Sequence, residues 1–300
     1  MRILFDNVNM GSSSGPNSFA RKLKSPLEKR GHHVDSSFSP KTTPDVQLAF
    51  IVSHYKYAPI VQRLDGLYFN IDQDYQSLNG PILSTYQESD AVIYQSEFNR
   101  NLAEYWFGEH ENGRVIRNGA DVDLIKTISP MKSSALDKFE NIWCCAASWR
   151  PHKRLSDNVR YFLEHASDKD CLVIAGENPD FSISNPRILY AGQLDWASLI
   201  SLYKRSSHFL HLAWLDHCPN VVVDARVSGC HIICSSTGGT SEIAGENSTI
   251  IKEEEWDFSP IKLYSPPRID FANKISNSII SEVSIEKVAE QYIEVMESVL

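Results

Sequence analysis

Short apolar runs alternate with amphipathic stretches over most of this chain. Runs such as "VQLAFIVS" (46–53) and "CLVIAG" (171–176) have the length and composition of buried strands. Stretches such as 96–108 repeat apolar residues at helical spacing, and this one begins at a serine and ends at a glycine. Alternation of short buried strands with helices predicts parallel sheets that are covered by helices on both faces.

Further elements follow from the same pattern. The expected strands are 2–5, 46–53, 66–71, 90–96, 141–148, 171–176, 187–192, 208–214 and 230–236, with a short strand and turn at 113–121. The expected helices are 18–30, 96–108, 154–167, 195–206, 219–229 and 284–300. The pattern pauses between these two halves and then starts again, which indicates two α/β sheets in tandem.

The pause divides the chain into two predicted domains. We predict an α/β fold with Rossmann-like domains at 1–125 and 141–283, joined by a linker at 126–140. Residues 284–300 form a C-terminal helix that could cross back to the first domain. Ligands of parallel sheets bind beyond the carboxyl ends of the strands, so a cleft between two facing domains is the expected site.

The composition of the chain limits which partners and which cellular location are expected. The net charge of −9 gives no global positive field, so no nucleic acid is expected as a partner. The first residues lack the apolar core of a signal peptide, and no apolar run reaches the roughly 20 residues of a membrane helix. We therefore expect no integral membrane segment and a cytoplasmic location. The cysteines show no C-x-x-C spacing and are expected to be buried, reduced thiols.

Two aspartates, Asp216 and Asp224, stand in the apolar stretch "LDHCPNVVVDARVSGC" at 215–230. Carboxylates in such a stretch must be solvated, paired or used, because burying an unpaired charge is costly. Asp216 falls in a loop after an expected strand, and Asn220 begins the next helix. The amides near Asn220 and Val221 are then helix-start donors that suit a phosphate.

The order of these groups suits a sugar nucleotide. A carboxylate can accept two hydrogen bonds from vicinal hydroxyls, so Asp216, the amides and Asp224 match sugar, diphosphate and ribose in turn. The alternative is that Asp216 merely caps a turn and that Asp224 is an exposed helix carboxylate. The spacing by itself does not separate these two interpretations.

The segment "DHCPNVVVDARVSGCHIICSSTGGTSEIAGEN" (216–247) resembles the E-x7-E region of the family-4 glycosyltransferases, a retaining family with the GT-B fold. The matching residues are Asp216, Pro219, Asn220, Asp224-Ala225, Ser228-Gly229, Gly238-Gly239 and Glu242. Aspartate replaces glutamate at both acidic positions, which shortens each reach by one methylene. The resemblance implies two Rossmann-like domains whose parallel sheets face each other across a cleft.

Other segments extend the resemblance over about 90–250. "AASWRPHKRL" is similar to the basic segment in which the family holds the donor diphosphate, with Lys153 at the position of the family's lysine and Arg150 displaced from the usual arginine. Without the family, Arg150, Lys153 and Arg154 would be interpreted as a solvated helix start. "VIRNGADVDLI" (115–125) resembles the family's segment that enters the hinge.

The first half offers candidates for a donor loop and for an acceptor side. "NMGSSSGPNSF" (9–19) occupies the first strand-to-helix loop, where the family has a glycine-rich loop against the donor. Gly15 suits close approach to a phosphate or sugar, although a flexible surface loop is the alternative. His54, Arg63 and Asp65 are possible acceptor-side residues. The alternatives are a polar loop histidine and a simple Arg63–Asp65 pair.

The resemblance implies a retaining glycosyltransferase that moves a sugar, a hexose by preference, from a nucleoside-diphosphate sugar to an acceptor hydroxyl. No metal and no cofactor are expected, because cations and helix-start amides balance the leaving phosphate. The acceptor is an unknown sugar, lipid-linked molecule or protein. The implied donor-binding residues are Gly15, Arg150, Lys153, Pro219, Asn220, Val221 and Asp224, and Asp216 is the implied catalytic residue.

Two rival interpretations remain at this point. Asp72 and Asp74 form a D-x-D triplet, which holds a divalent metal on sugar diphosphates in glycosyltransferases of the GT-A fold. The other rival is a degenerate GT-B protein that binds a sugar nucleotide without catalysis. The aspartates at both acidic positions motivate that second rival.

Overall fold

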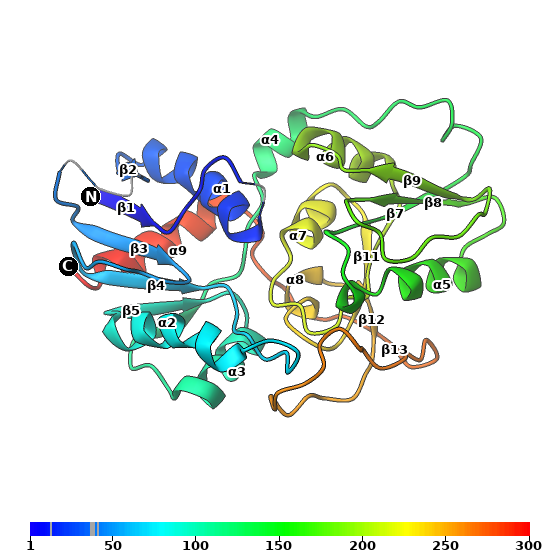
Figure 1. Ribbon diagram of the computed structural model, residues 1–300. Helices are drawn as coiled ribbons and strands as arrows, with labels where there is room; N and C mark the ends of the chain where they lie inside the picture. Colours follow the sequence, from blue (N-terminus) through cyan, green and yellow to red (C-terminus); the bar gives the residue numbers. More distant parts are fainter. Residues whose placement is uncertain (13, 37–39, 41) are drawn as a thin grey trace. The chain divides into compact units, whose positions relative to one another are not determined.

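The computed structural model describes residues 1–12, 14–36, 40 and 42–300, and the chain forms two compact units (Figure 1). Unit 1 consists of Met1–Asp121, Asp257–Ile261 and Glu282–Leu300. Unit 2 consists of Val122–Trp256 and Lys262–Ser281. Each unit contains its own sheet, so the expected pair of Rossmann-like sheets is confirmed.

The sheet of unit 1 is parallel, with the strand order β2-β1-β3-β4-β5-β6. Its strands are β1 (Arg2–Asp6), β2 (His33–Asp35), β3 (Val46–Phe50), β4 (Ile60–Leu64), β5 (Ala91–Tyr94) and β6 (Gly113–Val115). Its helices are α1 (Gly15–Lys29), α2 (Tyr75–Glu88), α3 (Glu97–Phe107) and α9 (Ile285–Glu297).

Side chains of β4 alternate between the two faces of this sheet. The guanidinium of Arg63 lies 4.0 Å from the ring centroid of Phe19 in α1, and its Nε donates to the Tyr292 hydroxyl of α9 at 3.0 Å. The next side chain, Gln62, donates to the carbonyl of Ile82 in α2 at 3.2 Å. Because successive strand residues face opposite sides, α1 and α9 cover one face and α2 covers the other (Figure 1).

Apolar periodicity explains why α1 and α9 pack on that face. Phe19, Leu23 and Leu27 recur every four residues on α1 and are fully buried. Tyr292 and Met296 do the same on α9, in the same core. Burying each such side chain stabilises the fold by about 1.5–3 kcal/mol, which fixes both helices to the sheet.

The sheet of unit 2 has the strand order β13-β12-β11-β10-β7-β8-β9. Its strands are β7 (Ile142–Ala146), β8 (Cys171–Ala175), β9 (Ile188–Gly192), β10 (His208–His211), β11 (His231–Ser235), β12 (Thr249–Ile251) and β13 (Lys274–Ser276). Its helices are α4 (Val122–Thr127), the 3-10 turn η1 (Pro151–Lys153), α5 (Leu155–His165), α6 (Trp196–Arg205), α7 (Asn220–Val227) and α8 (Ser241–Ala244). The pairing is parallel except at the edge, where β13 runs antiparallel to β12.

The strand orders locate the place in each sheet where a ligand is expected. From β9 to β12, unit 2 has the order 3-2-1-4-5-6 of dinucleotide-binding folds, which reverses between β7 and β10. In unit 1 the order reverses between β1 and β3. Ligands of such sheets bind beyond the carboxyl ends of the strands at this reversal, which we call the switch point of each unit.

One predicted strand is wrong. Residues 66–71 form no strand: the backbone N–H and C=O of Tyr68 bond to the side chain of Asn79 in α2 instead of to a neighbouring strand (2.9 and 2.7 Å). The fourth strand is β4, which begins at Ile60, six residues before the predicted start at 66. Its sequence "IVQRL" is buried throughout, but its two polar residues interrupt the apolar run that sequence patterns detect.

Several elements were missed for local reasons. Helix α2 contains Gly80 and Pro81, both of which argue against a helix in sequence patterns. Strands β2, β12 and β13 have three residues each, too few to show a period. The predicted linker at 126–140 begins inside α4. None of the described helices has the length and apolar composition needed to cross a membrane.

Candidate active site

Two loops meet at the switch point of unit 2. One follows β7 and contains η1, and the other follows β10 and leads into α7. Because β7 and β10 are parallel neighbours, both loops leave the same edge of the sheet. The backbone N–H of Trp214 in the second loop donates to the carbonyl of His152 in the first at 2.7 Å.

The two loops are also joined by an ion pair. Lys153 Nζ lies 2.5 Å from Asp216 Oδ2, although 63 positions separate the two residues in the sequence. His211, the last residue of β10, places Nε2 2.9 Å from the same oxygen. The other oxygen, Oδ1, accepts the backbone N–H of His217 at 3.1 Å. Only 14% of the Asp216 side chain is exposed, so this carboxylate is paired rather than solvated.

The protonation states follow from these contacts. Burial would raise the pKa of Asp216, but the Lys153 ammonium and the His211 hydrogen bond outweigh it and hold that pKa well below its ordinary value. Burial lowers the pKa of His211, against the opposing effect of Asp216. At neutral pH the imidazole is therefore neutral, and its Nε2 carries the proton because an ionised carboxylate only accepts.

The backbone of Asp216 is fixed by the glycine pair of the predicted motif. Gly238 has φ +90°, and a Cβ there would lie 2.5 Å from the carbonyl oxygen of Asp216. The next amide, of Gly239, donates to that same oxygen at 2.8 Å. Leu215, before Asp216, has φ +57°, a rare conformation for a branched residue. The Asp216 loop is therefore held tightly from outside, and position 238 requires glycine.

Helix α7 begins beside this aspartate. Pro219 is its N-cap and Asn220 its first residue. The N–H of Val222 bonds to the Pro219 carbonyl at 3.1 Å, and the amides of Asn220 and Val221 stand before it at the start of the first turn. The helix dipole adds partial positive charge at this end, which favours an anion.

Asp224 is buried on the second turn of α7. Its side chain accepts a hydrogen bond from Trp196 Nε1 of α6 at 3.0 Å, and the residue is 4% exposed. The alternative of an exposed helix carboxylate is therefore wrong. The indole of Trp196, which donates to this carboxylate, is partly exposed.

The basic residues of the first loop differ in their environment. Arg150 is exposed and forms the N-cap of η1. Arg154 is 2% exposed and donates to both carboxylate oxygens of Glu253 at 3.0 and 2.7 Å. Lys153 is paired with Asp216. The alternative of a solvated helix start therefore fails for Lys153 and Arg154.

Two predicted residues of unit 1 lie at its own switch point. Gly15 is the exposed first residue of α1, and a Cβ there would meet no atom within 4 Å. His54 is exposed in the loop after β3. The side chain of Asn7, which follows β1, donates to the carbonyl of Phe50 at the end of β3 at 2.8 Å. Part of the predicted glycine-rich loop, Ser13, lies outside the described residues.

Arg63 is not available to an acceptor, which corrects the expectation for this residue. It has no exposed surface, and its guanidinium contacts Tyr292, Asn118 (2.8 Å) and the carboxylate of Asp65. Asp65 also accepts from Gln95 Nε2 at 2.5 Å. The structure contains the alternative, a simple Arg63–Asp65 pair. The buried guanidinium needs such a counter-charge.

The D-x-D triplet is exposed in unit 1. Asp74 caps α2 by accepting the backbone N–H of Ser77 at 3.2 Å. Hydrogen bonds from the side chain and the backbone of Ser77 lower the pKa of its carboxyl. Asp72 lies in the exposed turn before that cap. Within the described residues, no three His, Cys, Asp or Glu side chains converge in a way that could hold a metal.

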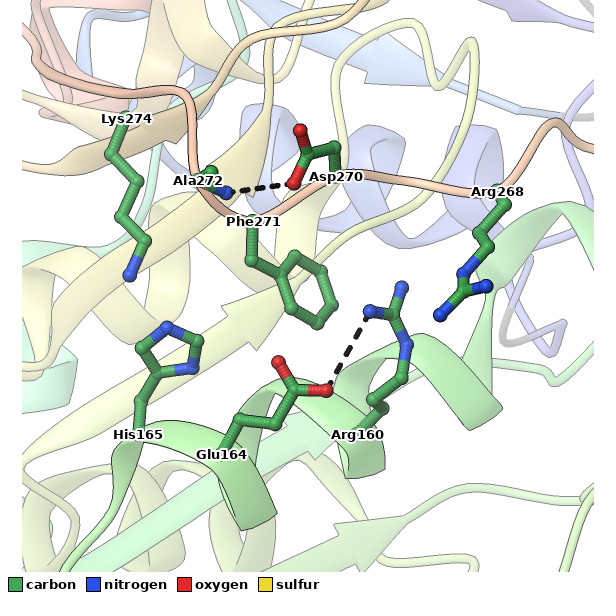
Figure 2. A pocket seen from close by; sticks show the side chains of 8 residues that line it. All are labelled: Arg160, Glu164, His165, Arg268, Asp270, Phe271, Ala272 and Lys274. Atoms are coloured by element: carbon green, nitrogen blue, oxygen red, sulfur yellow. Dashed lines mark hydrogen bonds and ion pairs between the residues drawn. The ribbon is translucent and has the colours of Figure 1, made fainter.

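A pocket of about 570 Å³ opens elsewhere in unit 2 (Figure 2). It is lined by Arg160, Glu164, His165, Arg268, Asp270, Phe271, Ala272 and Lys274, and so by none of the predicted site residues. The Arg160 guanidinium already pairs with Asp157 at 2.7 Å and lies 3.9 Å from the ring centroid of Phe271. The Arg160 guanidinium is thus already satisfied within the protein, and we assign the pocket no ligand.

Sequence patterns missed three residues that shape the site. His211 and Trp196 hold the two aspartates, and His152 carries the carbonyl that joins the loops. Burial lowers the pKa of His152 to about 3. The one available signal was the position of His211 at the end of a strand whose other residues are mainly apolar.

No protein-family model matches this chain, and no curated protein sequence matches it. Solved structures match it over nearly its whole length at low identity. HepE from Anabaena, in complex with UDP, shares 15% identity and a TM-score of 0.69, covering 99% of this chain and 100% of that one. Sucrose-phosphate synthase from Thermosynechococcus elongatus shares 12% identity and a TM-score of 0.63 (100% and 96% covered). A glycosyltransferase from Rickettsia africae shares 15% and 0.60 (99% and 98% covered).

These neighbours establish the fold class. The chain has the two-Rossmann-domain fold of the GT-B glycosyltransferases, as predicted. The GT-A alternative is wrong, because the chain builds a second complete sheet of its own. A structure of HepE in complex with UDP-glucose is also known.

Proposed function

We propose that this protein is a retaining, metal-independent glycosyltransferase that uses a nucleoside-diphosphate sugar. The observation that carries the proposal is the Lys153–Asp216 pair at the switch point of unit 2, beside the start of α7. A cation, a set of helix-start amides and a positioned carboxylate meet there, at the edge where such sheets bind nucleotides. The UDP and UDP-glucose complexes of HepE support a uridine-linked hexose as the first donor to test.

Each residue of this edge has a proposed role. Lys153, with Arg150 and the amides of Asn220 and Val221, balances the charge of the diphosphate. Asp216 accepts hydrogen bonds from the sugar that is transferred. Pro219 shapes the turn between these groups, and Gly15 of unit 1 keeps its predicted role in donor binding. Asp224, oriented by Trp196, accepts from the ribose hydroxyls.

Donor binding then requires an exchange of partners. Lys153 bonds to Asp216 in the structure, and when a diphosphate binds, its ammonium turns to the phosphate oxygens. His211 still donates to Asp216 Oδ2, so the carboxylate keeps its position when the lysine leaves. We propose His211 as the residue that makes this exchange possible.

The reaction step conserves atoms and configuration. The bond from the anomeric carbon to the diphosphate oxygen breaks while the acceptor oxygen bonds to the same face of that carbon. The leaving phosphate oxygen takes the acceptor proton, and the products are the glycoside and the nucleoside diphosphate. His54 is proposed on the acceptor side. Asp65, whose carboxylate pairs with Arg63, is proposed to support the fold.

Calorimetric titration of the Lys153→Ala variant with UDP and with uridine tests the proposal. A charge-assisted hydrogen bond contributes roughly 1.5–3 kcal/mol, so UDP affinity should fall by about 10- to 100-fold. Uridine affinity should not change. Lys169→Ala is the matched control, because Lys169 is an exposed lysine of unit 2 that pairs with Glu140. Equal UDP affinity of Lys153→Ala and wild type would contradict the assignment.

The same preparation tests metal independence and catalysis. Consumption of UDP-glucose should continue in excess EDTA, because protein cations do the work of a metal at the phosphates. Loss of turnover that manganese restores would overturn this part. Binding of UDP without any turnover of sugar donors would favour the non-catalytic alternative, which the burial of Asp224 also motivates.

A further inference from the structure

The loop that follows β3 in unit 1 presents aromatic side chains to solvent. We call residues 51–59 the aromatic loop. Tyr55 is 59% exposed and Tyr57 is 38% exposed, with their ring centroids 6.2 Å apart. The loop leaves the carboxyl end of β3, at the switch point of unit 1, where parallel sheets bind ligands.

The start of this loop is strained. Ile51 has φ +72°, and a β-branched residue in the left-handed region is a genuine outlier. Its N–H donates to the carbonyl of Arg63 at 2.9 Å, and its C=O accepts from Gln62 Nε2 at 2.7 Å. Strain of this kind persists only when its surroundings impose it, and it concentrates at ligand-binding sites.

A buried amide holds the rest of the loop rigid. Gln47 of β3 has no exposed surface, and its Nε2 donates to Asp6 Oδ2 at 2.7 Å and to the carbonyl of Tyr55 at 2.8 Å. Its Oε1 accepts the N–H of Tyr57 at 3.0 Å. The N–H of Ser53 donates to Thr85 Oγ1 at 2.9 Å. The two tyrosines therefore stand on a fixed backbone, so a ligand pays little entropy for ordering them.

The chemistry of the loop selects for a neutral ligand. Its one lysine, Lys56, already pairs with Asp90 at 3.3 Å, and no carboxylate lies in the loop itself. Two phenol rings give flat apolar faces with polar tips, and the His54 ring adds a polar group beside them. A pyranose has the matching character: one face of C–H groups and a rim of hydroxyls.

We propose that the aromatic loop binds the acceptor and that the acceptor is a neutral saccharide, whose pyranose ring stacks on Tyr55. The role as acceptor rests on the proposed glycosyltransferase function. The binding of a saccharide does not, since it depends on the loop itself. A long-chain lipid needs a wider apolar surface than two rings, and an anionic acceptor needs a cation that is not already paired.

Saturation-transfer NMR with methyl β-glucoside, methyl α-mannoside, maltose and lactose, in the presence of UDP, tests this proposal. At least one of these probes should bind wild type, with the strongest transfer to its ring C–H protons. Tyr55→Ala should weaken that binding by about tenfold. Tyr55→Phe should retain it, since the ring face remains. Tyr105→Ala is the matched control, because Tyr105 is 62% exposed in the last turn of α3.

The outcomes separate this proposal from the function on which the acceptor role rests. Binding of none of the probes to wild type, or unchanged binding to Tyr55→Ala, would overturn it. Loss of UDP affinity in Tyr55→Ala would also overturn it, since the loop would then act on the fold or the donor. If wild type fails to bind UDP but binds a saccharide through Tyr55, the glycosyltransferase proposal fails and saccharide binding stands.

Discussion

The switch-point loops of the two units are fixed in the same way, by a left-handed residue and a buried polar side chain, but they differ in charge. Ile51 in unit 1 has φ +72°, and Leu215 in unit 2 has φ +57°. A left-handed conformation costs such residues roughly 1–2 kcal/mol, so both loops are kept by their surroundings rather than by local preference. In each unit a buried polar side chain from the preceding strand, Gln47 or His211, bonds to the loop.

Charge is what differs between the loops. The loop of unit 2 carries Asp216, paired with Lys153, whereas the loop of unit 1 carries Tyr55 and Tyr57 on a neutral amide. A rigid charged edge suits a ligand that contains a diphosphate, and a rigid neutral edge suits a hydroxyl-bearing ligand. The same sheet architecture thus serves two kinds of ligand, because function resides in the loops rather than in the fold.

Removing the charge at the centre of unit 2 should give the largest effect. Asp216→Asn keeps the shape but removes the carboxylate that would face the reacting sugar. Turnover should fall by at least about 100-fold, because charge develops at the anomeric carbon only in the transition state. UDP affinity should be unchanged or higher, because Lys153 loses its competing partner. Steady-state kinetics and UDP titration measure the two effects.

Asp195→Asn is a suitable control for that variant. Asp195 is an exposed carboxylate of unit 2 that caps α6 through Ser198 at 2.8 Å, and its loss should leave turnover nearly intact. If Asp216→Asn lost only UDP affinity, the placement of sugar and nucleotide along α7 would be reversed. If it changed neither quantity, the Lys153 pair would be structural.

A smaller effect is expected one helical turn further on. Asp224→Asn should weaken UDP and uridine alike by about 1–3 kcal/mol, because both contain the ribose that this carboxylate would hold. Trp196→Phe keeps the carboxylate and removes the indole N–H that orients it, so its loss of affinity should be smaller. Calorimetry on both variants is the measurement. Loss of turnover with unchanged affinity for both ligands would contradict the ribose assignment.

The fold class could be predicted from the sequence because buried strands and helix faces require apolar residues at regular spacing. Strands such as β8, buried at every position, and helices such as α1, with a regular apolar stripe, need no information from distant residues. The prediction of the fourth strand failed because Gln62 and Arg63 are buried polar residues whose partners come from α2 and α9. Local patterns contain no sign of such partners.

The candidate site was predictable in its residues but not in its contacts. Spacing and resemblance marked Asp216 and Lys153, yet their direct pairing depends on β7 and β10 being neighbours in the sheet. The same limit applies to Arg63, which was expected on the acceptor side and is a buried structural cation. Tyr55 was missed because exposure of an aromatic residue depends on how its loop is held.

The last prediction concerns acid stability, which should separate the two units. In unit 2, burial lowers the pKa of His208 and of His217 to about 4, and that of His152 to about 3. In the unfolded chain these histidines are protonated below about pH 6.5, whereas in the folded unit they stay neutral until pH 4 or lower. Stability therefore falls as the pH drops from 6.5 towards 4, and then levels off as the folded histidines titrate.

Urea unfolding at pH 7 and pH 5, followed by 19F NMR of 5-fluorotryptophan, measures this difference. Trp106 reports on unit 1 and Trp143 on unit 2. The unfolding midpoint at Trp143 should fall more than that at Trp106, by an amount equivalent to up to about 2 kcal/mol for each of these partly buried histidines. His208→Gln should shrink the pH effect at Trp143, on which the His208 ring stacks at 4.0 Å. Coincident midpoints at both pH values would mean that the two units unfold together, and the predicted difference between them would be lost.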